Sequence, residues 1–298
     1  MQHALSNRPP PVWPGIVQAV AAVILFSISD TTSKYLRQTL PAGEIAWLRY
    51  LIFVIFGVIL VGRRRFTGVW PRRPWMQVFR GVTLLGSAIF FMVGLSHLQL
   101  ADAAAISFVS PAFITALSVP FLGEQVGIRR WSATIAGLIG VLIVIRPGGG
   151  TFQAAALWPL ASAACWAAAI ILTRKIGTAD RGETTLLWSA AVGLVILTFL
   201  APVGFVPPSA SEVGLGVWLG IAASTGQYLM ILAYRRAAAS LLAPFTYIQL
   251  LSSAALGYLV FGSVPDATAF LGAAIIIASG LYTVHRERVR ARQARLSL

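Results

Sequence analysis

Charged residues and cysteine are scarce in this sequence of 298 residues. Asp, Glu, Lys and Arg make up 11% of the chain, and cysteine occurs once, at Cys165. A single cysteine excludes an intramolecular disulfide framework and a multi-cysteine metal site. The charged fraction is far below the roughly one quarter that is usual in soluble domains. The chain is therefore not built like an ordinary soluble or disulfide-stabilised protein.

Motifs of several enzyme classes are also absent. The glycines at 148–150 are not followed by the lysine of a phosphate-binding loop, and there is no zinc-protease or nucleophile-elbow pattern. An intramembrane enzyme with a serine site assembled from distant helices is the alternative. Its base would have to be His3, His97 or His285, none of which lies near the middle of an expected helix. We therefore expect no enzymatic activity, no cofactor and no metal.

Hydrophobic residues are abundant, at 57% of the chain with a mean hydropathy of +0.80. They form runs of about 20 residues, long enough to cross a hydrocarbon core of roughly 30 Å. The sequence thus predicts an all-α membrane protein with ten transmembrane helices. Bounded by Pro, Gly and charged residues, these are expected near 14–36, 43–62, 74–98, 101–122, 128–145, 152–175, 183–203, 213–234, 240–262 and 267–286.

The formal net charge of +14 would point to nucleic acid in a soluble protein. Here the basic residues lie between the apolar runs, as the positive-inside rule predicts for cytoplasmic loops. With a cytoplasmic N-terminus, all 23 basic residues fall on the inner side except Lys34, Arg37 and Arg146 at outer ends and Arg49 within a helix. We expect a multi-pass protein of the bacterial inner membrane with both termini cytoplasmic and no nucleic-acid partner.

The two halves of the chain resemble each other when shifted by about 140 residues. Gly123 then meets Gly262, and Arg146 meets Arg286. A five-helix unit that is repeated once must enter the membrane in opposite senses, which makes it an inverted repeat with a site between the halves. The first repeat is expected over 1–147, and the second repeat with a basic cytoplasmic tail over 148–298.

Four segments resemble the ten-helix EamA branch of the drug/metabolite transporter superfamily: Trp-Leu-Arg-Tyr at 47–50, Leu-Ala-Asp-Ala-Ala-Ala-Ile-Ser-Phe-Val-Ser-Pro at 100–111, Leu-Gly-Glu at 122–124 and the Gly-rich run at 137–148. The resemblance covers essentially the whole chain. It implies a cavity lined by the first, third, fourth, sixth, eighth and ninth helices. Ser263 replaces the acid of the first half, so the resemblance implies no symmetric partner for Glu124.

Charged residues inside apolar spans are costly in lipid, so each is a functional candidate. Asp30 and Arg49 lie about six residues from the outer ends of their helices, roughly 9 Å deep, and could meet. Lys34 follows Asp30 by four residues and could share its carboxylate. Two interpretations stay open: a structural charge network, or groups that bind substrate or gate the outer mouth. His97 is interpreted as an interfacial histidine, with a proton relay as the alternative.

Polar and aromatic residues at similar depth are the candidate lining of a central cavity. Hydroxyls, amides and rings in apolar surroundings are typical of pockets for small organic molecules. For each residue the alternative is that it bonds to its own helix or faces lipid. On the fourth helix, Ala103, Ser107 and Ser110 are expected to form one stripe. The whole set is Ser27, Ser87, Phe90, Ser107, Ser110, Ser162, Trp166, Thr225, Gln227, Tyr228, Tyr247 and Gln249.

These observations favour a secondary transporter that exports small organic solutes, aromatic or other neutral amino acids in first place, by alternating access. Phosphorylated solutes would lack Lys and Arg at mid-depth, whereas a neutral amino acid can use amides and ring faces. Transport of riboflavin or a methyl-donor compound is the alternative that the family resemblance implies. A non-transporting scaffold or sensor is the other. Apart from its substrate and membrane lipid we expect no partner, and a monomer rather than an obligate oligomer.

The distribution of basic residues predicts the orientation. Cysteines introduced at Gly68 and Arg292 should both be protected from a membrane-impermeant thiol reagent in intact cells. Labelling of both from outside would show that the orientation is reversed.

Overall fold

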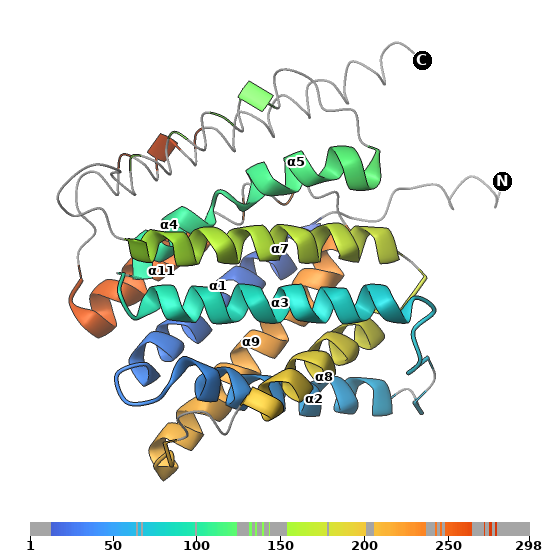
Figure 1. The fold of residues 1–298 in the computed structure, drawn as a ribbon, viewed down its shortest axis with the longest axis horizontal. Coiled ribbons are helices and arrows are strands. Elements are labelled where there is room, and N and C mark those ends of the chain that lie inside the picture. Colours follow the sequence, from blue (N-terminus) through green and yellow to red (C-terminus); the bar gives the residue numbers. More distant parts are fainter. Residues whose placement is uncertain are drawn as a thin grey trace.

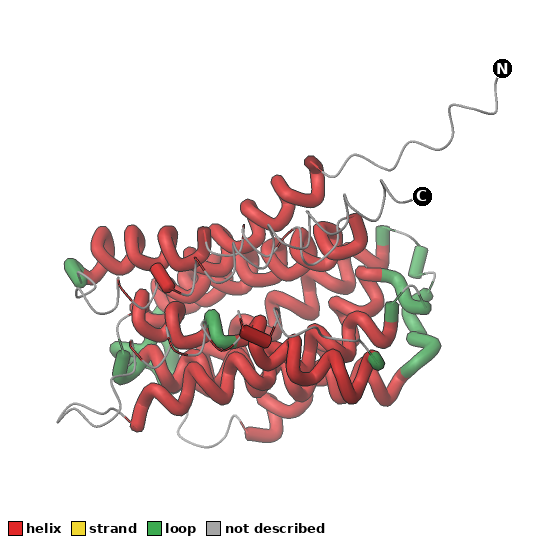
Figure 2. Tube along the Cα trace, turned by 90° about the horizontal axis from the view of Figure 1, so that it is seen from above, coloured by secondary structure: helices red, strands yellow, loops and turns green. Residues whose placement is uncertain are grey.

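The protein is described here by a computed structural model, and Figure 1 shows its fold. The residues that the structure describes are 13–63, 65–66, 68–98, 100–123, 131–132, 135, 139, 143, 154–177, 179–200, 206–236, 242, 245, 248–263, 271, 274–275 and 278. All regular structure within them is helical (Figure 2). The expected helices at 128–145 and 267–286 lie almost entirely outside the described residues.

The helices begin and end close to the predicted positions, because the Pro, Gly and charged residues used to place them do interrupt the apolar runs. Among the described residues, seven stretches are long and apolar enough to cross a membrane, which confirms an all-α membrane fold. The elements are α1 (Trp13–Leu36), α2 (Ala42–Gly62), α3 (Pro74–Leu95), α4 (Leu100–Ser107), α5 (Ser110–Leu122), the 3-10 turn η2 (Ala154–Ala156), α7 (Leu157–Ile176), α8 (Gly182–Leu200), α9 (Ala210–Arg236) and α11 (Ile248–Phe261).

The predicted single helix over 101–122 is wrong in one respect, because α4 and α5 are separate helices. The backbone turns at Phe108 and Val109, and α5 starts again with Pro111 in its first turn. Proline lacks an N–H and disfavours helical geometry in the residue before it. Ser107 and Ser110 therefore end one helix and begin the next, so they do not form a continuous stripe.

Each helix of the first half packs mainly on helices of the second half. In Figure 1, α3 and α7 lie side by side, and α1 packs on α9 in the same way. A two-fold rotation that places α1, α2 and α3 on α7, α8 and α9 would convert the α1–α9 contact into the α7–α3 contact. The same rotation would map the α2–α8 contact onto itself. The same exchange relates the packing of α2 on α9 to that of α3 on α8. Such an exchange is what an inverted repeat produces.

Small residues let these helices approach closely. A methyl group added at Gly193 of α8 would lie 2.1 Å from the ring of Tyr50 on α2, and one at Gly81 of α3 would lie 2.7 Å from Val192. Tyr50 is 1% exposed, so its ring has no free space to move into. Since lipid is as apolar as the side chains, contact of this kind holds membrane helices together in place of a hydrophobic driving force.

Gly193→Ala should destabilise the protein by about 1–3 kcal/mol, because the new methyl group overlaps the Tyr50 ring. Gly214→Ala in α9 is the matched control, since no atom lies within 4 Å of its added methyl group. Thermal unfolding in detergent, followed by size-exclusion chromatography, should show a lower midpoint for the first variant alone. Equal midpoints would mean that α2 and α8 do not pack this closely.

Candidate functional site

Asp30 lies near the end of α1 and Arg49 near the start of α2, so both are at the same end of the bundle. Gln249 of α11 donates to Asp30 Oδ2 at 3.5 Å. Asp30 is only 8% exposed. In the part of the chain that the structure describes, no ion pair joins Asp30 to Arg49. The expected direct pairing is therefore not formed, and a functional role for either group stays a prediction.

The Arg49 guanidinium makes no hydrogen bond to any described residue, and its Nε is buried without a partner. Guanidinium is a five-donor group, and an uncompensated charge inside a membrane protein is costly. Such a group is retained where it serves a ligand or a moving part. Arg49 is the one guanidinium of the described helices whose buried nitrogen lacks an acceptor.

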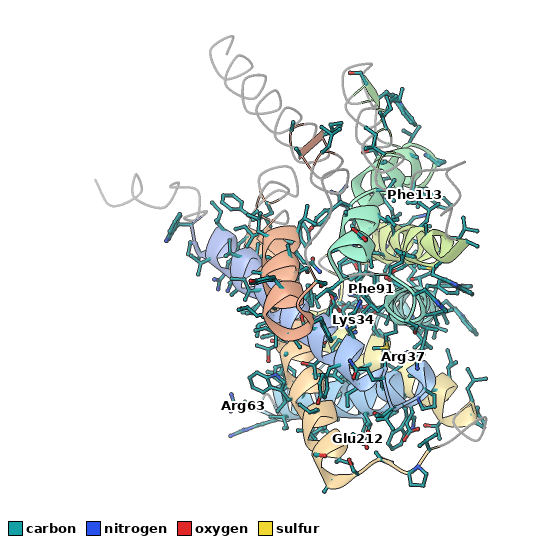
Figure 3. All side chains as sticks on the ribbon, turned by 90° about the vertical axis from the view of Figure 1, so that its left-hand side faces the viewer. Lys34, Arg37, Arg63, Phe91, Phe113 and Glu212 are labelled. Carbon is teal, nitrogen blue, oxygen red and sulfur yellow. The ribbon has the colours of Figure 1, made fainter. Side chains whose placement is uncertain are left out.

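Lys34 does not share the carboxylate of Asp30, in contrast to the expectation from their spacing. Its Nζ donates to the carbonyl of Leu98 at 2.6 Å and lies 5.5 Å from the ring centre of Phe261 (Figure 3). One residue beyond α1, Arg37 donates to Ser96 Oγ and to the carbonyl of Leu40. These contacts tie the end of α1 to the segment between α3 and α4, so Lys34 holds the helices at this end together.

Three of the predicted serines, Ser27, Ser87 and Ser162, hold neighbouring helices together. Ser27 Oγ lies 2.6 Å from Ser252 Oγ and accepts or donates at 3.2 Å to Ser253 Oγ, which joins α1 to α11. Ser162 Oγ donates to the carbonyl of Ser87 at 2.8 Å and joins α7 to α3. These hydroxyls are already hydrogen-bonded to other groups of the protein. We conclude that they position the helices around the site.

Aromatic residues divide between the interior and one end of the bundle. Phe26 of α1 and Trp166 of α7 meet edge to face, with ring centres 6.4 Å apart. Phe90 instead pairs with Trp158, and both line a cavity of about 530 Å³ whose rim carries the exposed His97. Its other lining residues are Ala154, Ala155, Leu157 and Ala161. This cavity lies between α3, η2 and α7, away from Asp30.

The remaining predicted residues have different surroundings. Ser107 donates to the carbonyl of Ala103 within its own helix, so its hydroxyl is occupied. Tyr228 donates to Glu183 at 3.3 Å, and its ring contacts Phe56. Gln227 is 7% exposed and makes no hydrogen bond to a described residue. Thr225 and Ser110 are half-buried. Tyr247 and Glu124 lie outside the described residues.

A buried polar network at the opposite end of the bundle was missed by the sequence analysis. Arg80, counted there among the cytoplasmic basic residues, is 2% exposed inside α3. Its Nε donates to Thr173 Oγ1 of α7 at 2.6 Å, and its Nη1 donates to Ser189 Oγ of α8. Hydroxyls and a carbonyl are the only acceptors that the described residues offer it. The sequence already indicates that Arg80 is inside the membrane, because it lies six residues inside the helix expected at 74–98.

Asp180 completes this network from the segment between α7 and α8. Its Oδ1 accepts from the backbone N–H of Arg72 at 2.7 Å, and its Oδ2 accepts from Gln77 Nε2 at 2.8 Å. Trp188 Nε1 also donates to the carbonyl of Val69. The segment before α3 and the start of α8 are thereby joined, so the two halves are closed against each other at this end.

In this protein the helices of one half pack on the helices of the other half, and some polar groups inside the bundle have no bonding partner. This arrangement is typical of secondary transporters. Residues 13–146 and 153–284 both match the EamA-like transporter family. The chain belongs to this family. The predicted membership of the drug/metabolite transporter superfamily, the two-repeat fold and the function as a membrane transporter are thereby confirmed, and family members are transporters rather than enzymes.

Relatives in this family differ in the solute after which they are named. A riboflavin transporter of Rhizobium johnstonii is 29% identical, with 98% of each chain covered. An S-adenosylmethionine uptake transporter of Rickettsia bellii is also 29% identical, over 92% of this chain and 94% of the relative. The pseudopaline exporter CntI of Pseudomonas aeruginosa is 26% identical, over 89% and 94%. None of the three is named for an amino acid.

A solved crystal structure shares the fold. It superposes with a TM-score of 0.69 at 20% identity and covers 93% of this chain and 98% of its own. The architecture is therefore kept over nearly the whole chain at low sequence identity.

The Asp180 network predicts a graded loss of stability. Asp180→Ala leaves the Arg72 N–H and one of the two N–H groups of Gln77 Nε2 without an acceptor, the other N–H still donating to Thr185 Oγ1, and should cost about 2 kcal/mol. Asp180→Asn keeps one acceptor and can donate to the otherwise unbonded Gln77 Oε1, so it should cost less. Thermal midpoints in detergent should rank wild type, Asn, Ala. A wild-type midpoint for Asp180→Ala would show that the network does not hold this end closed.

Proposed function

We propose that this protein is a secondary transporter of the bacterial inner membrane that exports a small neutral or zwitterionic organic solute by alternating access. An aromatic or other neutral amino acid is the first candidate. The observation that carries the proposal is the Phe26–Trp166 ring pair, which bridges α1 and α7 from the two halves. Rings of this kind can take up the apolar part of a solute at the interface that must rearrange during transport.

Polar groups near these rings support the same substrate class. Gly226 of α9 packs directly on the Phe26 ring, and the adjoining Gln227 has no described hydrogen-bond partner. An amide that is not already bonded within the protein can bond to a solute, which then gains affinity. Charge at this depth is restricted to a few residues such as Asp30 and Arg49, which suits a solute with one positive and one negative group.

A second candidate substrate is a solute with a larger planar ring, such as riboflavin or S-adenosylmethionine. The names of the relatives favour it, and the Phe26–Trp166 pair would suit a planar ring as well. The cytoplasmic position of both termini, action as a monomer, and the binding of substrate between the repeats 1–147 and 148–298 belong to the proposal.

Purified protein in liposomes should give saturable flux of Phe, Trp, Leu or Thr, and Trp166→Ala should lower it several-fold because the ring contact is lost. Trp75→Ala is the matched control, since Trp75 is 75% exposed at the start of α3. Measurement with and without a pH gradient separates proton coupling from facilitated diffusion. Flux of riboflavin or S-adenosylmethionine without any amino acid would support the second candidate. Flux of only a phosphorylated metabolite would contradict both.

A further inference from the structure

Two segments at one end of the bundle carry a dense set of basic side chains. Residues 63–73 join α2 to α3, residues 175–183 run from the end of α7 to the start of α8, and both lie at the right-hand end of Figure 1. Together they contain seven Lys and Arg residues and two acidic residues, Asp180 and Glu183. Both acids are buried, whereas the described basic residues are exposed. The exposed charge of this surface is therefore positive.

Hydrogen bonds between the two segments bring their basic residues together. The backbone N–H of Arg72 donates to Asp180 Oδ1 at 2.7 Å. Arg73 Nη1 donates to the carbonyl of Lys175 at 2.6 Å. These partners are 108 and 102 residues apart in the sequence, and they belong to the two halves of the chain. The cations are thus gathered by contacts between the halves and not by their spacing along the chain.

Further contacts hold the first segment in position. The carbonyl of Gly68 accepts from Thr184 Oγ1 at 2.5 Å, and the carbonyl of Val69 accepts from Trp188 Nε1 at 2.7 Å. Arg181 lies beside the same glycine, since a methyl group added at Gly68 would be 3.5 Å from Arg181 Cδ. Four exposed cations therefore share one surface whose shape is fixed by α8. This basic surface consists of Arg72, Arg73, Lys175 and Arg181.

Exposed aromatic side chains indicate which environment the basic surface faces. Trp70 is 80% exposed and Phe66 is 60% exposed. The Trp70 ring also lies against Trp188 of α8, with ring centres 5.5 Å apart. The segment joins two helices that are long and apolar enough to cross a membrane, so its rings lie where hydrocarbon gives way to lipid headgroups. Tryptophan is enriched at this level.

We propose that the basic surface binds the phosphate headgroup of an anionic phospholipid, and that this site is complete only while the two halves are closed against each other at this end. Guanidinium binds phosphate in a two-pronged, charge-assisted geometry. Anionic lipids are attracted by basic residues next to membrane-spanning helices. Because the cations come from both halves, a lipid bound to all of them stabilises the closed arrangement relative to an open one.

The surroundings of the basic surface favour a lipid over a soluble polyanion. Nucleic acid would be attracted by the same cations. It would leave the exposed rings of Trp70 and Phe66 in water, whereas a lipid offers its phosphate to the cations and its glycerol and acyl region to the rings. The lipid is also present in the membrane at all times.

Asp180 distinguishes an assembled site from a general attraction between cations and lipid. Its carboxylate is negative, so replacing it with a neutral side chain would strengthen a general attraction. In an assembled site the same replacement releases the N–H of Arg72 and lets the two segments separate. Binding would then weaken. The two interpretations predict changes of opposite sign.

The test measures the thermal midpoint of the purified full-length protein in neutral detergent as lipid is added. Dioleoyl phosphatidylglycerol should raise the midpoint saturably, because a ligand that binds the folded state stabilises it. Dioleoyl phosphatidylcholine, inorganic phosphate and a short DNA duplex are the comparisons and should not raise it. Equal stabilisation by phosphatidylcholine, by phosphate or by DNA overturns the proposal.

Single variants then locate the site. Arg72→Gln and Lys175→Gln keep the backbone groups that bond to Asp180 and Arg73. Each should weaken the affinity for phosphatidylglycerol about fivefold, as expected for one cation near an anionic lipid. Arg236→Gln is the matched control, because it removes one exposed charge at the end of α9, which packs mainly on α1 and α2. It should change the affinity less than about twofold. Equal weakening in all three variants would show an effect of overall charge and overturn the site.

Asp180→Ala is the decisive variant and should weaken the affinity for phosphatidylglycerol several-fold although it removes a negative charge. Unchanged or tighter binding overturns the assembled site. Thr184→Val removes the bond to the Gly68 carbonyl without changing any charge, and it should weaken binding in the same direction. Wild-type affinity in Thr184→Val also contradicts the proposal, and this variant decides alone if Asp180→Ala does not fold. No transported solute enters these measurements, so their outcome is independent of the substrate proposed above.

Discussion

The constraint on which this structure depends is that a polar or charged group within the hydrocarbon layer must find its partner inside the protein. Most described groups obey it locally: Ser107, Thr173 and Ser224 donate to carbonyls of their own helices. Others obey it across helices, as Ser162 does with Ser87. The same constraint explains why Arg80, although charged, is surrounded by hydroxyl and carbonyl acceptors from α7 and α8. Few described groups do not meet the constraint, and the Nε of Arg49 is one of them.

Satisfying these groups requires helices that approach closely, and small residues provide for this. Glycines on α3, α8 and α9 lie against the side chains of Val192, Tyr50 and Ile52, respectively. A side chain at any of these glycines would overlap its neighbour. The resulting contacts are rigid, and rigidity has a consequence for function. It lets short polar side chains such as Ser27 reach a neighbouring helix. Close packing and the hydrogen bonds between helices are thus two results of one arrangement.

The two ends of the bundle are closed by different chemistry. At the end where α1 finishes, Lys34 and Arg37 donate to the Leu98 carbonyl and to Ser96 Oγ in the segment between α3 and α4. Thr39 donates to the carboxylate of Glu212 in α9. At the opposite end, Asp180 and Arg80 join α3 to the α7–α8 region through buried hydrogen bonds. Relatives of this family are named for riboflavin, S-adenosylmethionine and pseudopaline. Membership of the family therefore accounts for transport, but it does not specify the solute.

The sequence by itself determined the membrane fold, the helix boundaries and the family, because hydrophobic length, proline and charge act locally along the chain. It also identified Asp30 and Arg49 as candidates, since a charge within an apolar run is visible without a structure. Only the tertiary structure decided which neighbours they have. The i, i+4 spacing placed Lys34 beside Asp30 on one helix, but the lysine reaches the Leu98 carbonyl from a different segment. Likewise, the depth of Arg80 could be read from its position, but its acceptors Thr173 and Ser189 lie about 90 and 110 residues further along the chain. Partners so distant in sequence are brought together by helix packing, which no local pattern encodes.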